Sequence, residues 1–288
     1  LGECATVVAG GMENMSQAPH VIRGARLGFK LGQGALEDSL MVALMDPFCG
    51  FYMAQTAENL AKEHGISRQE QDEFALRSQR AAAAAMEAGR LKDEIVPVKV
   101  KQGRKEITVD ADDHVRPDST MEGLASLRAA FSKDGTVTAG NASGIVDGAA
   151  ALLLTTAATA KARGWKALGR IVSWAYAGVE PRIMGIGPVP AIRAALDAAG
   201  MTIADLDLVE INEAFAAQVV PSYQDLGIDL DRLNVNGGAI AVGHPFGMTG
   251  ARLQNTMLNS LDWHDKTTGL ITMCVGGGQG MALILERI

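Results

Sequence analysis

The sequence predicts an α/β fold in which a mainly parallel or mixed β-sheet is covered by helices on both faces. From about residue 140 onward, short apolar stretches with strand character alternate with helical patterns of ten or more residues. This alternation is typical of such sheets. The chain has 288 residues, of which 48% are hydrophobic. That length is enough for a large core and about two domains.

The first part of the chain predicts one strand followed by a long irregular segment. Residues 5–9, in the stretch "ATVVAGG", have the composition of a buried strand, which the two glycines would end in a turn. The stretch "LGEC" before it has the character of the end of a helix. Residues 12–50 are rich in Gly, Met and Pro without a sustained period, so we expect them to form mostly loop.

One helix of the first half has clear start and stop signals. Ser67 and Glu70 stand three residues apart, which is the spacing of a capping box. An alanine-rich stretch follows, and Gly89 is expected to end the helix. The polar segment 90–135 predicts a layer outside the main core.

The second half predicts strands and helices in turn. Glycine, proline and small residues mark the junctions between them. Strands are expected within 140–156 and at 169–177, 206–211, 233–238, 269–274 and 281–288, and helices at 190–199, 212–224 and 249–261.

Charge and cysteine content exclude several classes of function. The net charge of −7 argues against nucleic-acid binding. The three cysteines, Cys4, Cys49 and Cys274, are too few and too scattered for a disulfide framework, and no C-x-x-C pair suggests a zinc site. No apolar run reaches the roughly 18 residues of a membrane span. These features predict a protein of a reducing compartment such as the cytoplasm, without metal.

Three short stretches that follow strands carry residues suited to catalysis. They are "NEAFA" with Asn212, "NGGAIAVGHPFGMTG" with His244, and "CVGGGQG" with Cys274. Each has a plain structural interpretation as well: Asn212 as a helix cap, His244 as a structural histidine, and Cys274 as a small buried residue. Ligands of such sheets bind at the carboxyl ends of strands. A histidine base, a cysteine and an oxyanion-binding asparagine at that edge most favour acyl transfer.

The same stretches, with four others, resemble the thiolases. The resemblance runs through the whole chain in the family's order, in "VAGGMENMSQAPH", "MAQTAENLA", "DGTVTAGNASGIVDGAAALL", "MGIGPVPAI", "NEAFAAQ", "NVNGGAIAVGHPFGMTGAR" and "CVGGGQG". It implies a layered αβαβα fold with mixed sheets, an incomplete first half and an inserted loop domain. Residues 1–14 and 146–166 would be the remnant of the N-terminal half, 15–145 the loop domain that binds CoA, and 167–288 the C-terminal half.

The resemblance implies a reversible Claisen condensation, or thiolysis, of 3-ketoacyl-CoA and acetyl-CoA through an acyl-enzyme, as in fatty acid metabolism and β-oxidation. His244 would activate the nucleophile and face a thioester oxygen, Asn212 would hold a water in that oxyanion site, and Cys274 would be the acid/base cysteine. The family's nucleophilic cysteine would lie before Leu1, at the start of a helix that Cys4 would end.

This chain alone is therefore expected to be inactive. The alternative is a catalytically silent fragment that binds CoA. A decarboxylating ketoacyl synthase is disfavoured, because those enzymes have two histidines, or a His and an Asn, beside the nucleophile, whereas the last motif here offers Cys274.

The resemblance also implies where CoA and the acyl chain bind. Arg116 matches a position near the nucleotide phosphates, and Ser143 one that contacts pantetheine. The tunnel positions are Leu44, Met53, Phe131, Met184, Ala214 and Phe215. Gly123 replaces a frequent serine, which would remove one polar contact to CoA. Tyr52 replaces the histidine of many short-chain members, which leaves longer 3-ketoacyl chains open. CoA would be substrate and product rather than a cofactor. A homodimer or homotetramer is expected, with no nucleic-acid or membrane partner.

Overall fold

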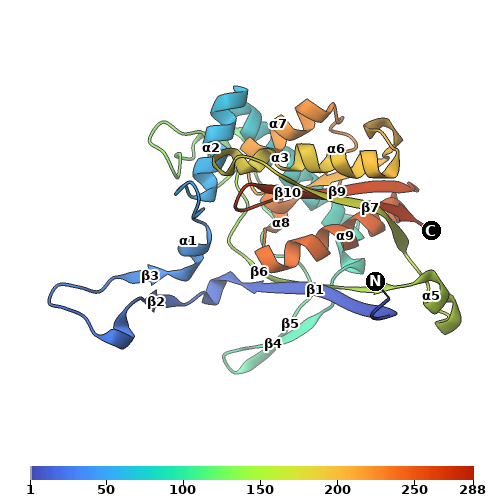
Figure 1. Ribbon diagram of the computed structural model, residues 1–288, viewed down its shortest axis with the longest axis horizontal. Coiled ribbons are helices and arrows are strands. Elements are labelled where there is room, and N and C mark those ends of the chain that lie inside the picture. Colours follow the sequence, from blue (N-terminus) through green and yellow to red (C-terminus); the bar gives the residue numbers. More distant parts are fainter. Residues whose placement is uncertain (1) are drawn as a thin grey trace.

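Residues 2–288, as described in a computed structural model, form stacked layers around a four-stranded mixed sheet (Figure 1). The sheet contains β7 (Gly169–Gly178), β8 (Leu208–Ile211), β9 (Thr268–Val275) and β10 (Gln279–Arg287) in the order β7-β10-β9-β8. β8 and β9 are parallel, and the other pairs are antiparallel. The α/β fold with a mixed sheet is thus confirmed.

Helices cover both faces of this sheet, as the sequence predicts. α6 (Pro188–Ala199) contacts β7, β9 and β10 on one face, and α7 (Ala216–Leu226) lies beside it. α9 (Phe246–Trp263) lies on the other face, where Leu253 and Met257 pack against Leu208 of β8. α9 also contacts a second, two-stranded sheet beneath it, so the layers follow one another as helix, sheet, helix and sheet (Figure 1).

The second sheet corrects the expectation for the start of the chain. β1 (Thr6–Asn14) pairs antiparallel with β6 (Asp147–Thr155) and runs straight through its two glycines instead of ending at them. A Cβ atom on Gly11 would overlap the carbonyl oxygen of Gly247. The glycines therefore allow α9 to approach the strand rather than form a turn.

The environment of β1 and the segment before it differ from the sequence expectations as well. β1 is not buried: the side chain of Val8 is 73% exposed, because the strand is covered on one face only. Residues 2–4 are not helical, and Leu1 lies outside the described residues.

The helix with the capping box is confirmed in detail. α3 spans Arg68–Glu87, the Ser67 side chain accepts from the Glu70 backbone N–H, and the Glu70 carboxylate accepts from the Ser67 N–H. Gly89 follows with a φ of 75°, the left-handed conformation in which helices commonly stop. α2 (Met53–His64) precedes α3, and both helices pack in the main core with α7.

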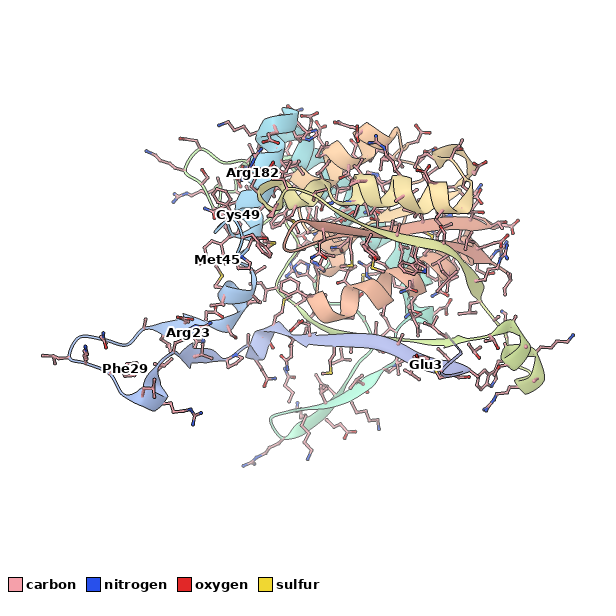
Figure 2. The ribbon with its side chains drawn as sticks, in the orientation of Figure 1. Glu3, Arg23, Phe29, Met45, Cys49 and Arg182 are labelled. Carbon is pink, nitrogen blue, oxygen red and sulfur yellow. The ribbon has the colours of Figure 1, made fainter. Side chains whose placement is uncertain are left out.

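Residues 12–50 contain short elements within a mostly irregular path. β2 (His20–Ile22) and β3 (Leu36–Asp38) form an arm that reaches away from the body, with Arg23 and Phe29 on it (Figure 2). The remaining elements of the described chain are α1 (Ser39–Ala43), β4 (Val98–Gln102), β5 (Lys105–Val109), α4 (Met121–Ala125), α5 (Ala157–Arg163), α8 (Ala239–Val242), and 3-10 turns at Met15–Gln17, Ala25–Leu27, Arg90–Asp93, Pro181–Ile186 and Ile203–Asp205.

Two expectations for the second half need correction. Residues 233–238 do not form a strand; Leu233 makes a single bridge with Val209 of β8, and the backbone then turns at Asn234, whose φ is 46°. α7 begins at Ala216, not at Asn212. The division of the chain into an N-terminal remnant, a loop domain and a C-terminal half stays a prediction. Within residues 2–288, no helix combines the length and apolar character that crossing a bilayer requires.

Candidate active site

His244 is held in one orientation by its own loop. It lies between α8 and α9, after Gly243, whose φ of 91° and ψ of 169° are accessible almost only to glycine. A Cβ at Gly243 would also overlap the side chain of Val146. The Thr249 hydroxyl donates to the Pro245 carbonyl at 2.9 Å and so accepts from the Nδ1–H of His244 at 2.7 Å. This arrangement leaves the Nε2 lone pair of His244 directed toward the site.

Asn212 meets that imidazole from the end of β8. Its backbone N–H donates to the Thr272 carbonyl of β9 at 2.9 Å, which continues the parallel pairing of the two strands. The Asn212 side chain is 1% exposed, and its Nδ2 lies 3.3 Å from His244 Nε2. Its Oδ1 is buried without a hydrogen-bond partner among the described residues. The helix-cap interpretation of Asn212 is wrong, because the N-cap of α7 is Phe215.

His244 is neutral in this environment. Burial, assisted by the positive charge of Arg252, lowers the pKa of His244 to about 4. The protonated imidazolium is therefore disfavoured at neutral pH, and Nε2 is available as a proton acceptor.

Cys274 occupies the next strand end in the sheet. It is the penultimate residue of β9, pairs with Gly280 of β10 and is 8% exposed. Burial raises the pKa of the Cys274 thiol to about 12. The thiol is thus protonated at neutral pH, and a thiolate formed there would be a strong base.

Four of the predicted tunnel residues surround this thiol. Met184 and Ala214 form a buried cluster with Cys274, and Met53 and Phe215 pack against it. Leu44 is linked to this cluster through Met53, whose N–H donates to the Leu44 carbonyl at 2.9 Å. Phe131 is 43% exposed and, among the described residues, is not part of this cluster.

Two of the glycines after Cys274 are required by the backbone conformation of the turn. Gly277 and Gly278 both have a φ of 83° and form the turn between β9 and β10. A Cβ at Gly278 would overlap the Val179 carbonyl oxygen. The turn therefore requires glycine at these two positions whether or not a ligand passes over them.

The residues predicted to bind CoA lie on a separate loop cluster that adjoins the site. The Ser143 N–H donates to the Ala214 carbonyl at 3.0 Å, which ties the "GNASG" loop to the cysteine cluster. Arg116 and Gly123 line a cavity of about 470 Å³ together with His114 and Ile240. The Arg116 guanidinium is exposed and donates to the Asp113 carbonyl at 3.1 Å.

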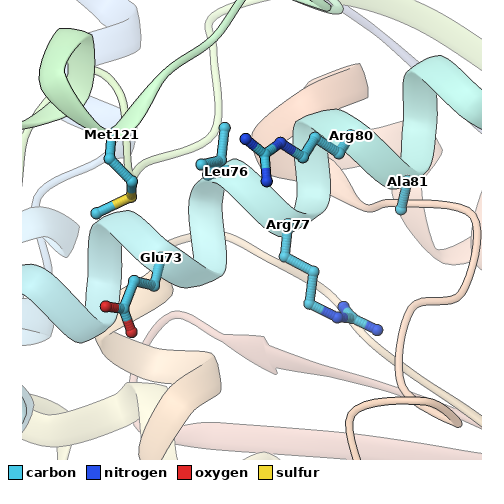
Figure 3. A pocket seen from close by; sticks show the side chains of 6 residues that line it. All are labelled: Glu73, Leu76, Arg77, Arg80, Ala81 and Met121. Atoms are coloured by element: carbon cyan, nitrogen blue, oxygen red, sulfur yellow. The ribbon is translucent and has the colours of Figure 1, made fainter.

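A second cavity, of about 560 Å³, contains none of the predicted site residues. It lies along α3, where Leu76 and Arg80 point to one side and Arg77 to the other (Figure 3). Arg77 donates to the carbonyls of Leu230 and Leu233, so its guanidinium is engaged within the fold. No three His, Cys, Asp or Glu side chains within residues 2–288 are grouped to hold a metal ion.

Glu213 is a structural residue of the site that the sequence interpretation missed. It is fully buried and accepts from Ser78 Oγ at 2.6 Å, Asn234 Nδ2 at 2.7 Å and the Ile240 N–H at 3.1 Å. Burial raises the pKa of Glu213, and these hydrogen bonds oppose the rise. Glu213 thereby anchors the segment that leads to His244. The sequence feature that could have identified Glu213 is its position as a charged residue between Asn212 and an apolar helix.

Comparison of the sequence with known proteins gives matches to thiolases along the whole chain. The model of the thiolase N-terminal domain matches residues 1–158, and that of the thiolase C-terminal domain matches residues 165–287. The acetyl-CoA acetyltransferase of Shinella zoogloeoides is 53% identical over 288 residues, which cover 100% of this chain and 73% of that protein.

Solved structures agree with the sequence matches. Human mitochondrial 3-ketoacyl-CoA thiolase in complex with CoA superposes with a TM-score of 0.96 at 47% identity, over 100% of this chain and 72% of that one. The Bacillus anthracis acetyl-CoA acetyltransferase superposes with a TM-score of 0.97 at 45% identity, over 100% and 73% of the two chains.

Proposed function

Because the chain belongs to the thiolase family of acyltransferases, we propose that His244, Asn212 and Cys274 carry out the carbon–carbon bond chemistry of a reversible Claisen condensation of acyl-CoA thioesters. The observation that carries this proposal is the contact between Asn212 and His244 beside the strand that carries Cys274. Asn212 contacts His244 directly, and its backbone is bonded to β9 two residues before Cys274. CoA and acyl-CoA are the proposed substrates and products.

His244 and Asn212 are suited to stabilise the oxygen of a thioester as it becomes an enolate. The neutral imidazole can take a proton from a thiol through Nε2 and then donate it in a hydrogen bond to that oxygen. Asn212 has a buried Oδ1 without a partner among the described residues, so it can accept a hydrogen bond from a water whose second proton points to the same oxygen. Loss of one such donor typically raises the barrier by about 3 kcal/mol.

Cys274 is suited to move the proton of the α-carbon. In thiolysis the protonated thiol, favoured by its raised pKa, gives its proton to the α-carbon of the departing acetyl-CoA enolate. In condensation the thiol first gives its proton to the CoA thiolate that leaves during acyl transfer, and the resulting thiolate removes an α-proton from acetyl-CoA. The apolar cluster around it excludes water, which strengthens the base.

Substitutions in the complete enzyme test these two roles. His244→Ala should lose nearly all activity in both directions, measured by thiolysis of acetoacetyl-CoA. Cys274→Ser should still form acyl-enzyme from acetyl-CoA while condensation is nearly lost. Normal turnover by either variant would refute the corresponding role.

We also propose that residues 1–288 do not themselves supply the nucleophile of the acyl-enzyme. Cys4 is exposed and does not stand at the start of a helix, Cys49 is half-buried in a loop, and Cys274 is buried as a protonated thiol. The test is to incubate residues 1–288 with acetyl-CoA and measure the intact mass. Stoichiometric thioester formation on any one cysteine would contradict the proposal.

CoA binding without turnover is the alternative function, and the cavity at Arg116 favours it as an activity of residues 1–288 alone. Titration calorimetry with CoA should detect binding that Arg116→Ala weakens. Longer 3-ketoacyl chains are candidate substrates as well, since Tyr52 departs from the short-chain pattern. Comparing acetoacetyl-CoA with a longer 3-ketoacyl-CoA on the complete enzyme would decide it.

The assembly and location of the protein remain proposals. We expect a homodimer or homotetramer, which is supported by apolar side chains exposed on the β2–β3 arm, such as Leu27 at 93% and Phe29 at 45% (Figure 2). All three cysteines are free, which suits the reducing cytoplasm, or the mitochondrial matrix in a eukaryote. Light scattering of the purified protein would measure the assembly.

A further inference from the structure

Asp46 is a buried carboxylate for which the proposed reaction gives no role. It is 2% exposed although it lies in a loop, the segment that joins α1 to α2. Its Oδ1 accepts from the backbone N–H groups of Phe48, at 2.8 Å, and Cys49, at 3.1 Å. Its Oδ2 accepts from the N–H of Gly277 at 2.9 Å, across 231 positions of the sequence.

These contacts join two parts of the candidate site. One is residues 44–53, here called the tunnel loop, and the other is the turn Gly276–Gly278, here called the glycine turn. The tunnel loop is closed on itself, since the Met53 N–H donates to the Leu44 carbonyl and the Asp46 N–H to the Phe51 carbonyl, both at 2.9 Å. Figure 2 places Met45 and Cys49 where this loop meets the body.

Both parts adjoin Cys274, one by packing and the other along the chain. Met53, the last residue of the tunnel loop, packs against the cluster that contains Cys274. The glycine turn begins two residues after Cys274. The hydrogen bond from the Gly277 N–H to Asp46 therefore ties the segment that packs against the Cys274 cluster to the turn that follows Cys274.

The carboxylate is charged in this setting. Burial acts to raise the pKa of Asp46, but the N–H groups of Phe48, Cys49 and Gly277 and the Cys49 side chain outweigh it, so the pKa lies below its ordinary value. Hydrogen bonds to a charged acceptor are roughly twice as strong as those between neutral groups. A neutral amide at this position would have to direct its NH₂ group at one of the donors.

We propose that Asp46 is a positioning residue of the condensation step: its carboxylate clamps the tunnel loop to the glycine turn and so keeps the acyl-binding end of the site closed over Cys274. The proposal rests on the role of Cys274 given above. It adds a residue that touches neither substrate nor thiol and acts through the backbone of Gly277.

Hydrogen exchange and alkylation test the clamp without requiring turnover. In the unmodified protein the Gly277 amide should exchange more slowly than that of Gly276. In Asp46→Asn the Gly277 amide should exchange roughly tenfold faster or more, the factor expected for loss of one hydrogen bond to a charged group. Iodoacetamide should then label Cys274 faster by a similar factor, with the exposed Cys4 as internal reference.

Two control variants separate the clamp from a general loss of stability. Asp134→Asn removes an exposed carboxylate of the same type, and Ser67→Ala removes a distant helix cap. Neither should change exchange at Gly277 or labelling of Cys274. Unchanged exchange and labelling in Asp46→Asn, or equal changes in the controls, would overturn the clamp.

A kinetic comparison in the complete enzyme ties the clamp to the reaction. Asp46→Asn should leave acyl-enzyme formation from acetyl-CoA unchanged and lower the rate of condensation about tenfold, which corresponds to about 1.4 kcal/mol. An equal fall in both half-reactions would refute a positioning role at Cys274. If the proposed role of Cys274 itself fails, Cys274→Ser turns over normally while the exchange result still reports on the clamp.

Discussion

Replacement of Glu210 by glutamine should make the stability of the protein less dependent on pH. Glu210 lies in β8, 1% exposed, two residues before Asn212. Because side chains alternate along a strand, it shares with Leu208 the face of the sheet that is covered by α9. Its Oε2 has no hydrogen-bond partner among the described residues, so the ionised carboxylate is poorly compensated there.

The sign and size of the effect follow from the pKa of Glu210. Burial raises it from the ordinary 4.5 to about 8; Arg252 opposes the rise, and Glu213 and Glu94 reinforce it. At pH 7 the folded protein keeps this proton and the unfolded chain has released it. The free energy of unfolding therefore falls as pH rises from 4.5 to about 8, by roughly 5 kcal/mol in all for the shift given.

Glutamine resembles the protonated carboxyl in shape and cannot ionise. Glu210→Gln should match the parent near pH 4.5 and exceed its stability by a few kcal/mol, roughly, at pH 8. Urea denaturation followed by circular dichroism between pH 5 and 8 measures the difference. Glu87→Gln, at an exposed position of α3, is the control, and its free energy of unfolding should change with pH as that of the parent does. Parallel curves for Glu210→Gln and the parent would refute the reasoning.

Three further predictions concern a cap, a glycine and the cysteines. Ser67→Ala should lower the free energy of unfolding by about 1 kcal/mol, because it removes half of the capping box of α3; an unchanged urea midpoint would contradict this. Gly243→Ala should destabilise by at least 1–3 kcal/mol, roughly, since it adds strain at a φ of 91° and overlaps Val146; a thermal scan that matches the parent would count against it. Iodoacetamide at neutral pH should label Cys4 first and Cys274 last, because Cys274 is buried and protonated; early labelling of Cys274 would disprove that charge state.

The sequence allowed the second half to be predicted better than the first. Caps and periodic patterns located α3, α6, α9 and the strands of the central sheet to within a few residues. β1 was misjudged because its two glycines suggested a turn, whereas they permit contact with Gly247, more than 200 residues away. A contact of that kind leaves no local signal, and the same holds for the hydrogen bond from Gly277 to Asp46.

The charge states of the candidate site could not be predicted from the three short stretches that carry Asn212, His244 and Cys274, because residues outside those stretches set them. Met53 and Met184 desolvate Cys274, and Arg252 adds to the burial of His244. Both groups are consequently neutral, and moving a proton from such a thiol to such an imidazole is uphill by roughly 11 kcal/mol from their pKa values of about 12 and about 4. If the site works as proposed, the Cys274 proton passes instead to the CoA thiolate that leaves when the acyl-enzyme forms, so the same burial that keeps the free thiol protonated couples its deprotonation to the presence of substrate.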